Sequence, residues 1–290
     1  MTRLLNLVRY RFFLYAGLLP YLLGAAWAYG MEGVFHPDLF WLGFFGILLS
    51  VVGVEAFNEY FDSRMGTDRV FEPEDVPPMP FAVLWLGLAS FAGAAAIGLR
   101  LAGLCGWPVL LYAGLGGIAA AFYVGPPIRW VYRGWGEAMI ALSYGPWMTL
   151  GSLYLHARAF SWGALAASLV PGLLIAALAV VNEIPDYHQD RLVGKRNWVV
   201  RLGRRAGVRL YLALAAAGLA VPALGALAGL FPPAALLSLG ALPLLVHSGR
   251  VARRTYEVPR EFVPAVRSIV LCYAAATGTF SLALALGGMR

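Results

Sequence analysis

Long apolar segments recur along the whole chain, and they constrain its fold more than any other feature. Of its 290 residues, 60% are hydrophobic and 13% are charged, which is about half the charged fraction of an ordinary soluble domain. A helix needs about 20 mainly apolar residues to cross a bilayer. We therefore predict an all-α, polytopic membrane protein in which residues 1–290 form a single domain. The nine predicted spans lie roughly at residues 12–30, 38–61, 81–101, 104–123, 135–155, 161–184, 206–229, 232–248 and 266–288.

Basic residues fall mostly on one side of this predicted topology. Arg100, Arg158 and Arg290 lie on one side, and the other 19 of the 22 lysines and arginines lie on the opposite side. Because loops rich in lysine and arginine stay in the cytoplasm, we expect a multi-pass protein of the inner, cytoplasmic membrane with its N-terminus inside. The net charge of +7 is then a topology signal, and we expect no nucleic-acid partner.

The scarce acidic residues gather at the ends of two predicted spans. Each cluster begins with Asn-Glu-x-x-Asp, at Asn58 and at Asn182, and both clusters lie on the predicted cytoplasmic side. Such a pair is typical of an ancient internal duplication, although two short strings can also coincide by chance. Together the clusters hold 6 of the 15 acidic residues: Glu59, Asp62, Asp68, Glu183, Asp186 and Asp190.

Carboxylates beside a membrane are costly, so their concentration here indicates that a cation binds. Asn182, Asp186 and Asp190 are spaced i, i+4, i+8 and share one face of a helix, whereas Pro185 between them either bends that helix or ends it. Mg²⁺ prefers carboxylate, water and phosphate oxygens, and a phosphate or diphosphate commonly completes its shell. The predicted metal ligands are Asn58, Asp62, Asp68, Asn182, Asp186 and Asp190.

Basic residues near both acidic clusters favour a diphosphate as that remaining ligand. Carboxylates for metal ions that alternate with cations for phosphate oxygens form the pattern of a metal–diphosphate site. Each arginine taken alone also fits a topology signal or a contact with a lipid headgroup. The basic residues concerned are Arg9 before the first span, Arg64 in the first cluster, Arg129 and Arg133 after the fourth span, and Lys195 and Arg196 after the second cluster.

Three segments together resemble a known family. Asn58-x₃-Asp62-x₅-Asp68 and Asn182-x₃-Asp186-x₃-Asp190, the second followed by Gly194-Lys195-Arg196-Asn197, resemble the two aspartate-rich motifs of the UbiA superfamily of membrane prenyltransferases. The segment from Tyr123-Val124-Gly125-Pro126-Pro127 to Tyr144-Gly145-Pro146 resembles the branch that prenylates 1,4-dihydroxy-2-naphthoate in menaquinone synthesis.

The resemblance implies a nine-helix bundle around a central cavity, covered by cytoplasmic cap loops, and Mg²⁺-dependent ionisation of a polyprenyl diphosphate. It also implies that Asn58, Asp62, Asp68, Asn182, Asp186 and Asp190 bind metal and diphosphate, and that Lys195, Arg129 or Arg133 contacts diphosphate oxygens. We predict that Asp62, Asp68, Asp186, Asp190 and Lys195 act in catalysis. The predicted substrate contacts, from the resemblance and from the basic residues together, are Asn58, Asn182, Arg9, Arg64, Arg129, Arg133 and Arg196. Tyr123 is the preferred candidate among several tyrosines for stabilising the allylic cation through its ring face. Anchoring at the membrane interface is the alternative role for each tyrosine.

The acceptor is predicted to be 1,4-dihydroxy-2-naphthoate, and several alternatives stay open. They are 1,4-dihydroxy-6-naphthoate, 4-hydroxybenzoate, homogentisate, a carotenoid or a glycerol phosphate. An ion or metal transporter is an alternative of another class, although its acids are expected at the midplane and these lie at the rim. Glu55 and Glu137 are predicted to be buried, and Glu55 is expected either to remove a proton from the acceptor or to pair with an arginine.

Overall fold

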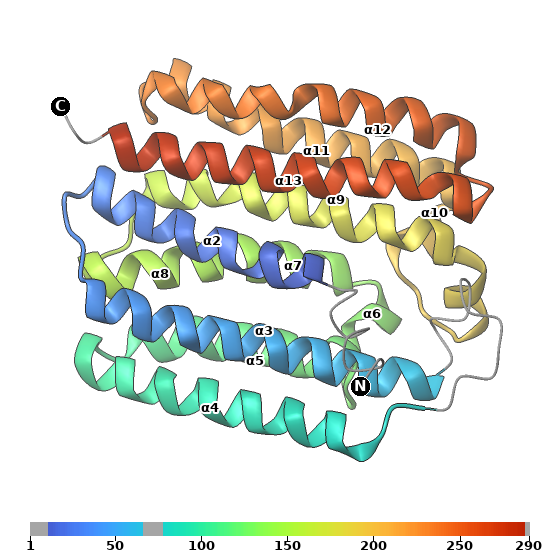
Figure 1. The fold of residues 1–290 in the computed structure, drawn as a ribbon, viewed down its shortest axis with the longest axis horizontal. Coiled ribbons are helices and arrows are strands. Elements are labelled where there is room, and N and C mark those ends of the chain that lie inside the picture. Colours follow the sequence, from blue (N-terminus) through green and yellow to red (C-terminus); the bar gives the residue numbers. More distant parts are fainter. Residues whose placement is uncertain (1–10, 66–77, 288–290) are drawn as a thin grey trace.

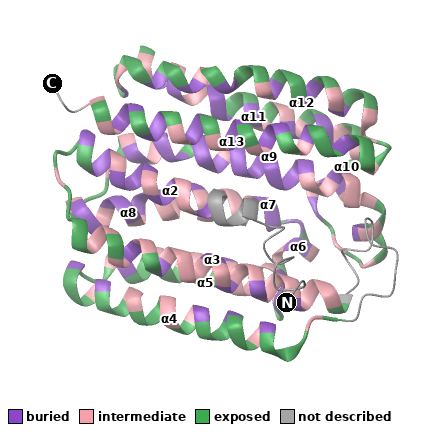
Figure 2. Cartoon of the chain, in the orientation of Figure 1, coloured by how far each residue is buried: buried purple, intermediate pink, exposed green. Residues whose placement is uncertain are grey.

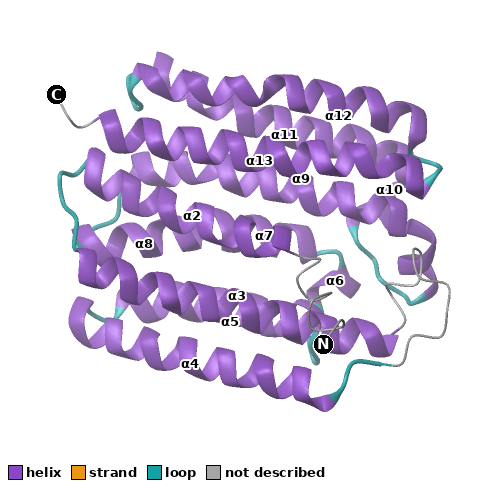
Figure 3. Cartoon of the chain, in the orientation of Figure 1, coloured by secondary structure: helices purple, strands orange, loops and turns teal. Residues whose placement is uncertain are grey.

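The computed structural model describes residues 11–65 and 78–287, and in these two ranges it contains helices and connecting loops but no strand (Figure 3). The long helices run side by side along one axis (Figure 1). The first part of the chain forms α2 (Arg11–Gly30), α3 (Pro37–Met65), α4 (Phe81–Cys105), α5 (Pro108–Val124), α6 (Trp130–Arg133), α7 (Gly136–Leu142), the π-helix η2 (Ser143–Trp147) and α8 (Met148–Ala157). The second part forms α9 (Trp162–Leu192), α10 (Trp198–Leu202), α11 (Arg204–Leu227), the 3₁₀-helix η3 (Pro233–Ala241), α12 (Leu242–Thr255) and α13 (Pro259–Gly287).

Each of the nine predicted spans overlaps a helix in the described ranges. Six helical segments there are long and apolar enough to cross a membrane, namely α3, α4, α9, α11, η3 together with α12, and α13. The helix α5 is apolar but shorter, and the run from α7 through η2 to α8 is interrupted by a π-helical turn. The multi-pass helical architecture is therefore confirmed, and nine crossings stay a prediction.

The helix α9 lies at the centre of the bundle and carries the second acidic cluster. It packs against α2, α7, η2, α8, α11 and α13, and most of its length is buried (Figure 2). Small residues permit this close packing: a Cβ at Gly145 would lie 2.8 Å from the Cα of Gly172 on α9. The helix continues through Pro185 to Leu192, so the proline does not end it. The motif from Asn182 to Asp190 consequently occupies one continuous helix, as the spacing predicted.

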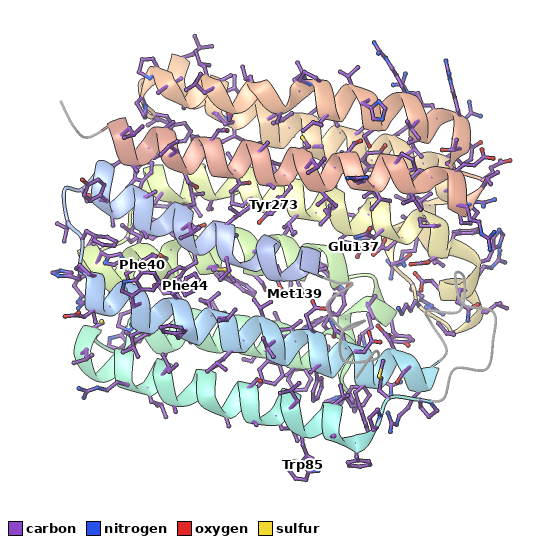
Figure 4. All side chains as sticks on the ribbon, in the orientation of Figure 1. Phe40, Phe44, Trp85, Glu137, Met139 and Tyr273 are labelled. Carbon is purple, nitrogen blue, oxygen red and sulfur yellow. The ribbon has the colours of Figure 1, made fainter. Side chains whose placement is uncertain are left out.

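The outer helices present apolar side chains to their surroundings. On α4, Trp85 is 65% exposed and points away from the bundle (Figure 4). The helices α11 and α12 lie at the opposite edge of the bundle from α4 (Figure 1). Exposed apolar surface of this kind is stable in lipid and costly in water, which agrees with an integral membrane protein.

Candidate active site

The two acidic clusters meet at one end of the bundle, where Lys195 joins them. The Nζ atom of Lys195 lies 3.6 Å from Oδ1 of Asp62 on α3 and 3.4 Å from Oδ1 of Asp190 on α9. A turn brings the lysine back over the helix it has just left: Gly194 adopts a positive φ of 82°, and the amide of Lys195 donates to the carbonyl of Asp190 at 2.9 Å. The lysine and the two carboxylates are largely buried, which strengthens their mutual attraction.

Asn197 fixes the orientation of Asp190. Its Nδ2 donates to Oδ2 of Asp190 at 2.7 Å, and its Oδ1 accepts a hydrogen bond from the amide of Val200 at 2.8 Å as the N-cap of α10. The side chain is completely buried. The sequence interpretation did not select this residue, although an asparagine directly before a short helical segment is an N-cap signal.

The oxygen atoms that these residues present fit a hard divalent cation. The Oδ1 atom of Asn58 is buried and has no hydrogen-bond partner in the described part of the chain, so it is available to a ligand. Carboxylate and amide oxygens are the ligand types that Mg²⁺ takes from proteins. No group of three or more His, Cys, Asp or Glu side chains within residues 11–65 and 78–287 is arranged to hold a metal by itself. The predicted ligand Asp68 and the predicted substrate contact Arg9 lie outside the described residues.

Three of the predicted substrate contacts, Arg129, Arg133 and Arg196, take part in contacts within the protein, through a side chain or a backbone amide. Arg133 donates to the carbonyl of Pro127 at 3.4 Å, and the amide of Arg196 donates to the carbonyl of Val131 at 3.3 Å. Arg129 has a positive φ of 53°, and its guanidinium lies 5.6 Å from the ring centre of Tyr132. Their contact with substrate stays a prediction.

Arg64 is held against its own helix. Its guanidinium carbon lies 3.6 Å from the ring centre of Tyr60, and its Nη1 donates to the carbonyls of Tyr60 at 3.1 Å and Met79 at 3.0 Å. These contacts fasten the chain entering α4 to the end of α3. A role for Arg64 in substrate binding also stays a prediction.

Tyr132 on α6 is a further polar group at this site that the sequence interpretation did not select. Burial raises the pKa of its hydroxyl, and the charges of Lys195, Asp62, Arg129 and Asp190 all act on it. A neutral phenol among these charges can donate a hydrogen bond to an anionic ligand.

A second pair of acids, Glu137 and Glu183, lies near Asp190 and Lys195. Glu137 on α7 is completely buried and accepts a hydrogen bond from the amide of Trp198, and Glu183 on α9 interacts with it directly. Figure 4 shows Glu137 toward the end of the bundle that carries α6 and α10. The expectation that Glu137 is buried is thus confirmed, and its position is fixed by a backbone amide from the segment after the second motif.

A mainly apolar cavity of about 530 Å³ begins near the first acidic cluster on α3. Glu55, Asn58 and Tyr123 line its polar end, and α3, α4, α5, η2 and α8 supply its mainly apolar walls. No ion pair joins Glu55 to a lysine or arginine of the described residues, so the expected pairing with an arginine is not observed there. The ring of Tyr123 packs against Gly136, where a Cβ would lie 3.1 Å from its Cε2 atom.

Tyr21 lines the other end of this cavity, and two phenylalanine rings lie against its ring. The hydroxyl of Tyr21 donates to the carbonyl of Phe40 at 2.6 Å, and its ring lies 5.5 Å from that of Phe40 and 6.4 Å from that of Phe44. Phe40 and Phe44 lie toward the end of the bundle remote from Glu137 (Figure 4). The cavity is therefore suited to a long apolar chain whose charged head stays beside Asp62, Asp190 and Lys195.

These features define an integral membrane protein in which a lysine-bridged acidic cluster lies beside a mainly apolar cavity. Residues 17–270 match the model of the UbiA prenyltransferase family, so the chain belongs to this family and is an enzyme that transfers prenyl groups. Membership favours the prenyltransferase interpretation of the sequence over the transporter alternative.

Two curated relatives are similar over most of their length. The chain is 26% identical over 250 residues to a 2-carboxy-1,4-naphthoquinone phytyltransferase of Synechocystis sp., covering 84% of this chain and 80% of the relative. It is 30% identical over 252 residues to a 1,4-dihydroxy-2-naphthoate octaprenyltransferase of Mycobacterium tuberculosis, covering 82% and 83% respectively.

Solved structures share the fold at lower sequence identity. A UbiA homologue from Aeropyrum pernix aligns with a TM-score of 0.67 at 19% identity, over 91% of this chain and 96% of the other. A UbiA homologue from Archaeoglobus fulgidus bound to GPP and Mg²⁺ aligns with a TM-score of 0.60 at 16% identity, over 96% and 99% respectively.

Proposed function

We propose that this enzyme transfers the prenyl group of a polyprenyl diphosphate to an aromatic acceptor, 1,4-dihydroxy-2-naphthoate, in menaquinone biosynthesis. The observation that carries the proposal is the bridge from Lys195 to both acidic clusters, beside the end of the apolar cavity that Asn58 lines. It offers a diphosphate a cationic contact and a carboxylate-rich metal environment together. The acceptor class is supported by the relatives, whose names specify naphthoquinone and naphthoate substrates.

The residues that would hold Mg²⁺ are Asn58, Asp62, Asp68, Asn182, Asp186 and Asp190. A homologue of the same fold binds GPP with Mg²⁺, which supports the choice of metal. Bound Mg²⁺ supplies Lewis-acid stabilisation of the negative charge that develops on the departing diphosphate.

The chain's own groups account for the rest of the reaction. Lys195 donates to a diphosphate oxygen while the bond between C1 of the prenyl chain and the diphosphate oxygen breaks. The face of Tyr123 stabilises the allylic cation that remains, and the apolar cavity keeps water from it. A carbon of the electron-rich acceptor ring then bonds to C1, and the proton that this carbon loses as the ring regains aromaticity passes to the released diphosphate.

We further propose that residues 1–290 form one domain with nine membrane crossings, and that the site faces the cytoplasm beneath cap loops. The support is the distribution of lysine and arginine, 19 of 22 of which fall on the predicted cytoplasmic side. The location would then be the inner membrane, with the site open to soluble acceptors.

An acceptor panel tests the proposal directly. Purified protein is incubated with Mg²⁺, a polyprenyl diphosphate and each acceptor in turn, and both released diphosphate and prenylated product are measured. Prenylation of 1,4-dihydroxy-2-naphthoate, and its loss in Asp62→Ala and Asp186→Ala variants that still insert and fold, is the expected result. Prenylation of another acceptor alone would reject the acceptor assignment, and full activity of both variants would remove these residues from the site.

A further inference from the structure

A second cavity, of about 460 Å³, lies between α11 and α12, away from the candidate active site. It is lined by Arg205, Val208, Arg209, Leu212, Arg253 and Tyr256. It shares no lining residue with the apolar cavity beside Asn58 and Tyr123. The two helices form the edge of the bundle opposite α4 (Figure 1). A ligand in this cavity would therefore be separate from the proposed prenyl substrate.

Three arginines converge on this cavity from two helices. Arg205 and Arg209 lie one turn apart near the start of α11, and Arg253 lies in the last turn of α12. All three are exposed, and no ion pair joins any of them to a carboxylate in the described part of the chain. Guanidinium groups that converge without a counter-charge repel one another and create a positive potential. The arrangement therefore favours an anionic ligand.

Contacts beside the cavity fix the positions of α11 and α12, the two helices that carry these arginines. The hydroxyl of Tyr211 on α11 hydrogen-bonds to Oγ of Ser248 on α12 at 3.1 Å, and Ser248 donates to the carbonyl of Ala265 on α13 at 2.9 Å. A Cβ at Gly249 would lie 3.2 Å from Leu212, so α11 and α12 approach closely beside the cavity. Buried contacts consequently fix the spacing of the two helices beside the cavity.

The inner wall of the cavity is apolar and continues along exposed helix surface. Val208 is buried and Leu212 is half-buried, and Ala216, one further turn along the same face of α11, is exposed. On α12, Val246 is 43% exposed. Both helices belong to candidate membrane spans. A ligand with an anionic head among the arginines can thus place an apolar tail along the bundle surface.

We propose that this cavity binds the headgroup phosphate of an anionic phospholipid, with an acyl chain lying along α11 and α12. Arginines at the end of a membrane-spanning helix lie at the depth of lipid phosphates. One guanidinium group can donate two parallel hydrogen bonds to two oxygens of the same phosphate. Tyr256 adds a hydroxyl and a ring that suit the same interfacial depth. A free phosphate would use the arginines but not the apolar wall, which is why the lipid is the assigned source.

The test compares two triple variants that lose the same charge. In one, Arg205, Arg209 and Arg253 are replaced by Gln, and in the control, Arg250, Arg254 and Arg260, which are exposed and do not line the cavity, are replaced by Gln. Dioleoylphosphatidylglycerol, dioleoylphosphatidylcholine and inorganic phosphate are titrated in detergent, and bound lipid is counted by native mass spectrometry beside thermal unfolding.

Wild type and the control variant are expected to bind phosphatidylglycerol in preference to phosphatidylcholine. The cavity variant is expected to bind phosphatidylglycerol about a hundredfold more weakly, since each interfacial arginine contributes on the order of fivefold. Equal binding by the cavity variant and wild type, or an equal loss in the control, would overturn the proposal. If inorganic phosphate at the same concentration raised the unfolding temperature as much as phosphatidylglycerol does, the ligand would be a free anion and the lipid assignment would be wrong. If the triple variant does not fold, Arg209→Gln and Arg253→Gln are each expected to weaken binding about fivefold.

Discussion

Replacing Asn197 tests the link that orients Asp190. The variant Asn197→Ala removes the donor that lies 2.7 Å from Asp190 and the acceptor that caps α10 through the amide of Val200. A hydrogen bond to a charged group contributes about 1.5–3 kcal/mol, and an N-cap contributes about 1 kcal/mol. The free energy of unfolding should therefore fall by about 2.5–4 kcal/mol if the two losses add. Turnover should fall about 10- to 100-fold, as it does when a partner that orients a metal ligand is lost.

Two further variants separate the two hydrogen bonds. Asn197→Ser keeps an oxygen that can cap α10 but is too short to donate to Asp190, so the cap is retained and turnover falls as in Asn197→Ala. Asn197→Asp keeps the cap and the shape but places a second carboxylate against Asp190, so turnover should fall further. Steady-state release of diphosphate is measured beside thermal unfolding of each variant in the same detergent. Wild-type turnover in Asn197→Ser would refute the orienting role and leave Asn197 as a helix cap only.

Three other perturbations address the proposed site. Lys195→Met removes the cation between the acidic clusters and should lower turnover about 10²- to 10³-fold, and unchanged kinetics would exclude Lys195 from the reaction. Removing divalent ions with EDTA should abolish turnover and added Mg²⁺ should restore it, whereas activity that persists in EDTA would contradict the metal site. Gly116 lines the apolar cavity and a Cβ there meets nothing within 4 Å, so Gly116→Leu should shift the preference toward shorter prenyl diphosphates. Gly114, on the same helix but outside the cavity, supplies the matched control Gly114→Leu, and an equal shift in both variants would contradict this placement of the prenyl chain.

The apolar helices and the second acidic motif were predictable from the sequence because both depend on local patterns. Segments of sufficient apolar length become helices in a membrane whatever their partners, since unpaired backbone groups are too costly there. The spacing of Asn182, Asp186 and Asp190 likewise fixes a common helix face. The course of the helix through Pro185 was not decided by the sequence, because the tight packing of α9 among its neighbours compensates for the lost hydrogen bond.

The side-chain contacts of the site depend on tertiary structure, and the sequence did not provide them. The bridge from Lys195 to Asp62 joins residues that are far apart in the chain, and it requires the turn at Gly194. Glu55 is a second example of a contact that the sequence did not predict. Its position on α3 was clear, but only the fold shows that it faces the cavity beside Asn58.

The short segment 195–198, which follows the second acidic motif, organises the site because its residues contact several different helices. Lys195 reaches α3 and α9, the amide of Arg196 donates to α6, the side chain of Asn197 holds Asp190 on α9, and the amide of Trp198 donates to Glu137 on α7. These contacts are made by consecutive residues, so inserting one residue would displace all of the later ones from their partners. The order Lys195-Arg196-Asn197-Trp198 is therefore tied to geometry: the four residues together contact α3, α6, α7 and α9, and Lys195 contacts both Asp62 and Asp190.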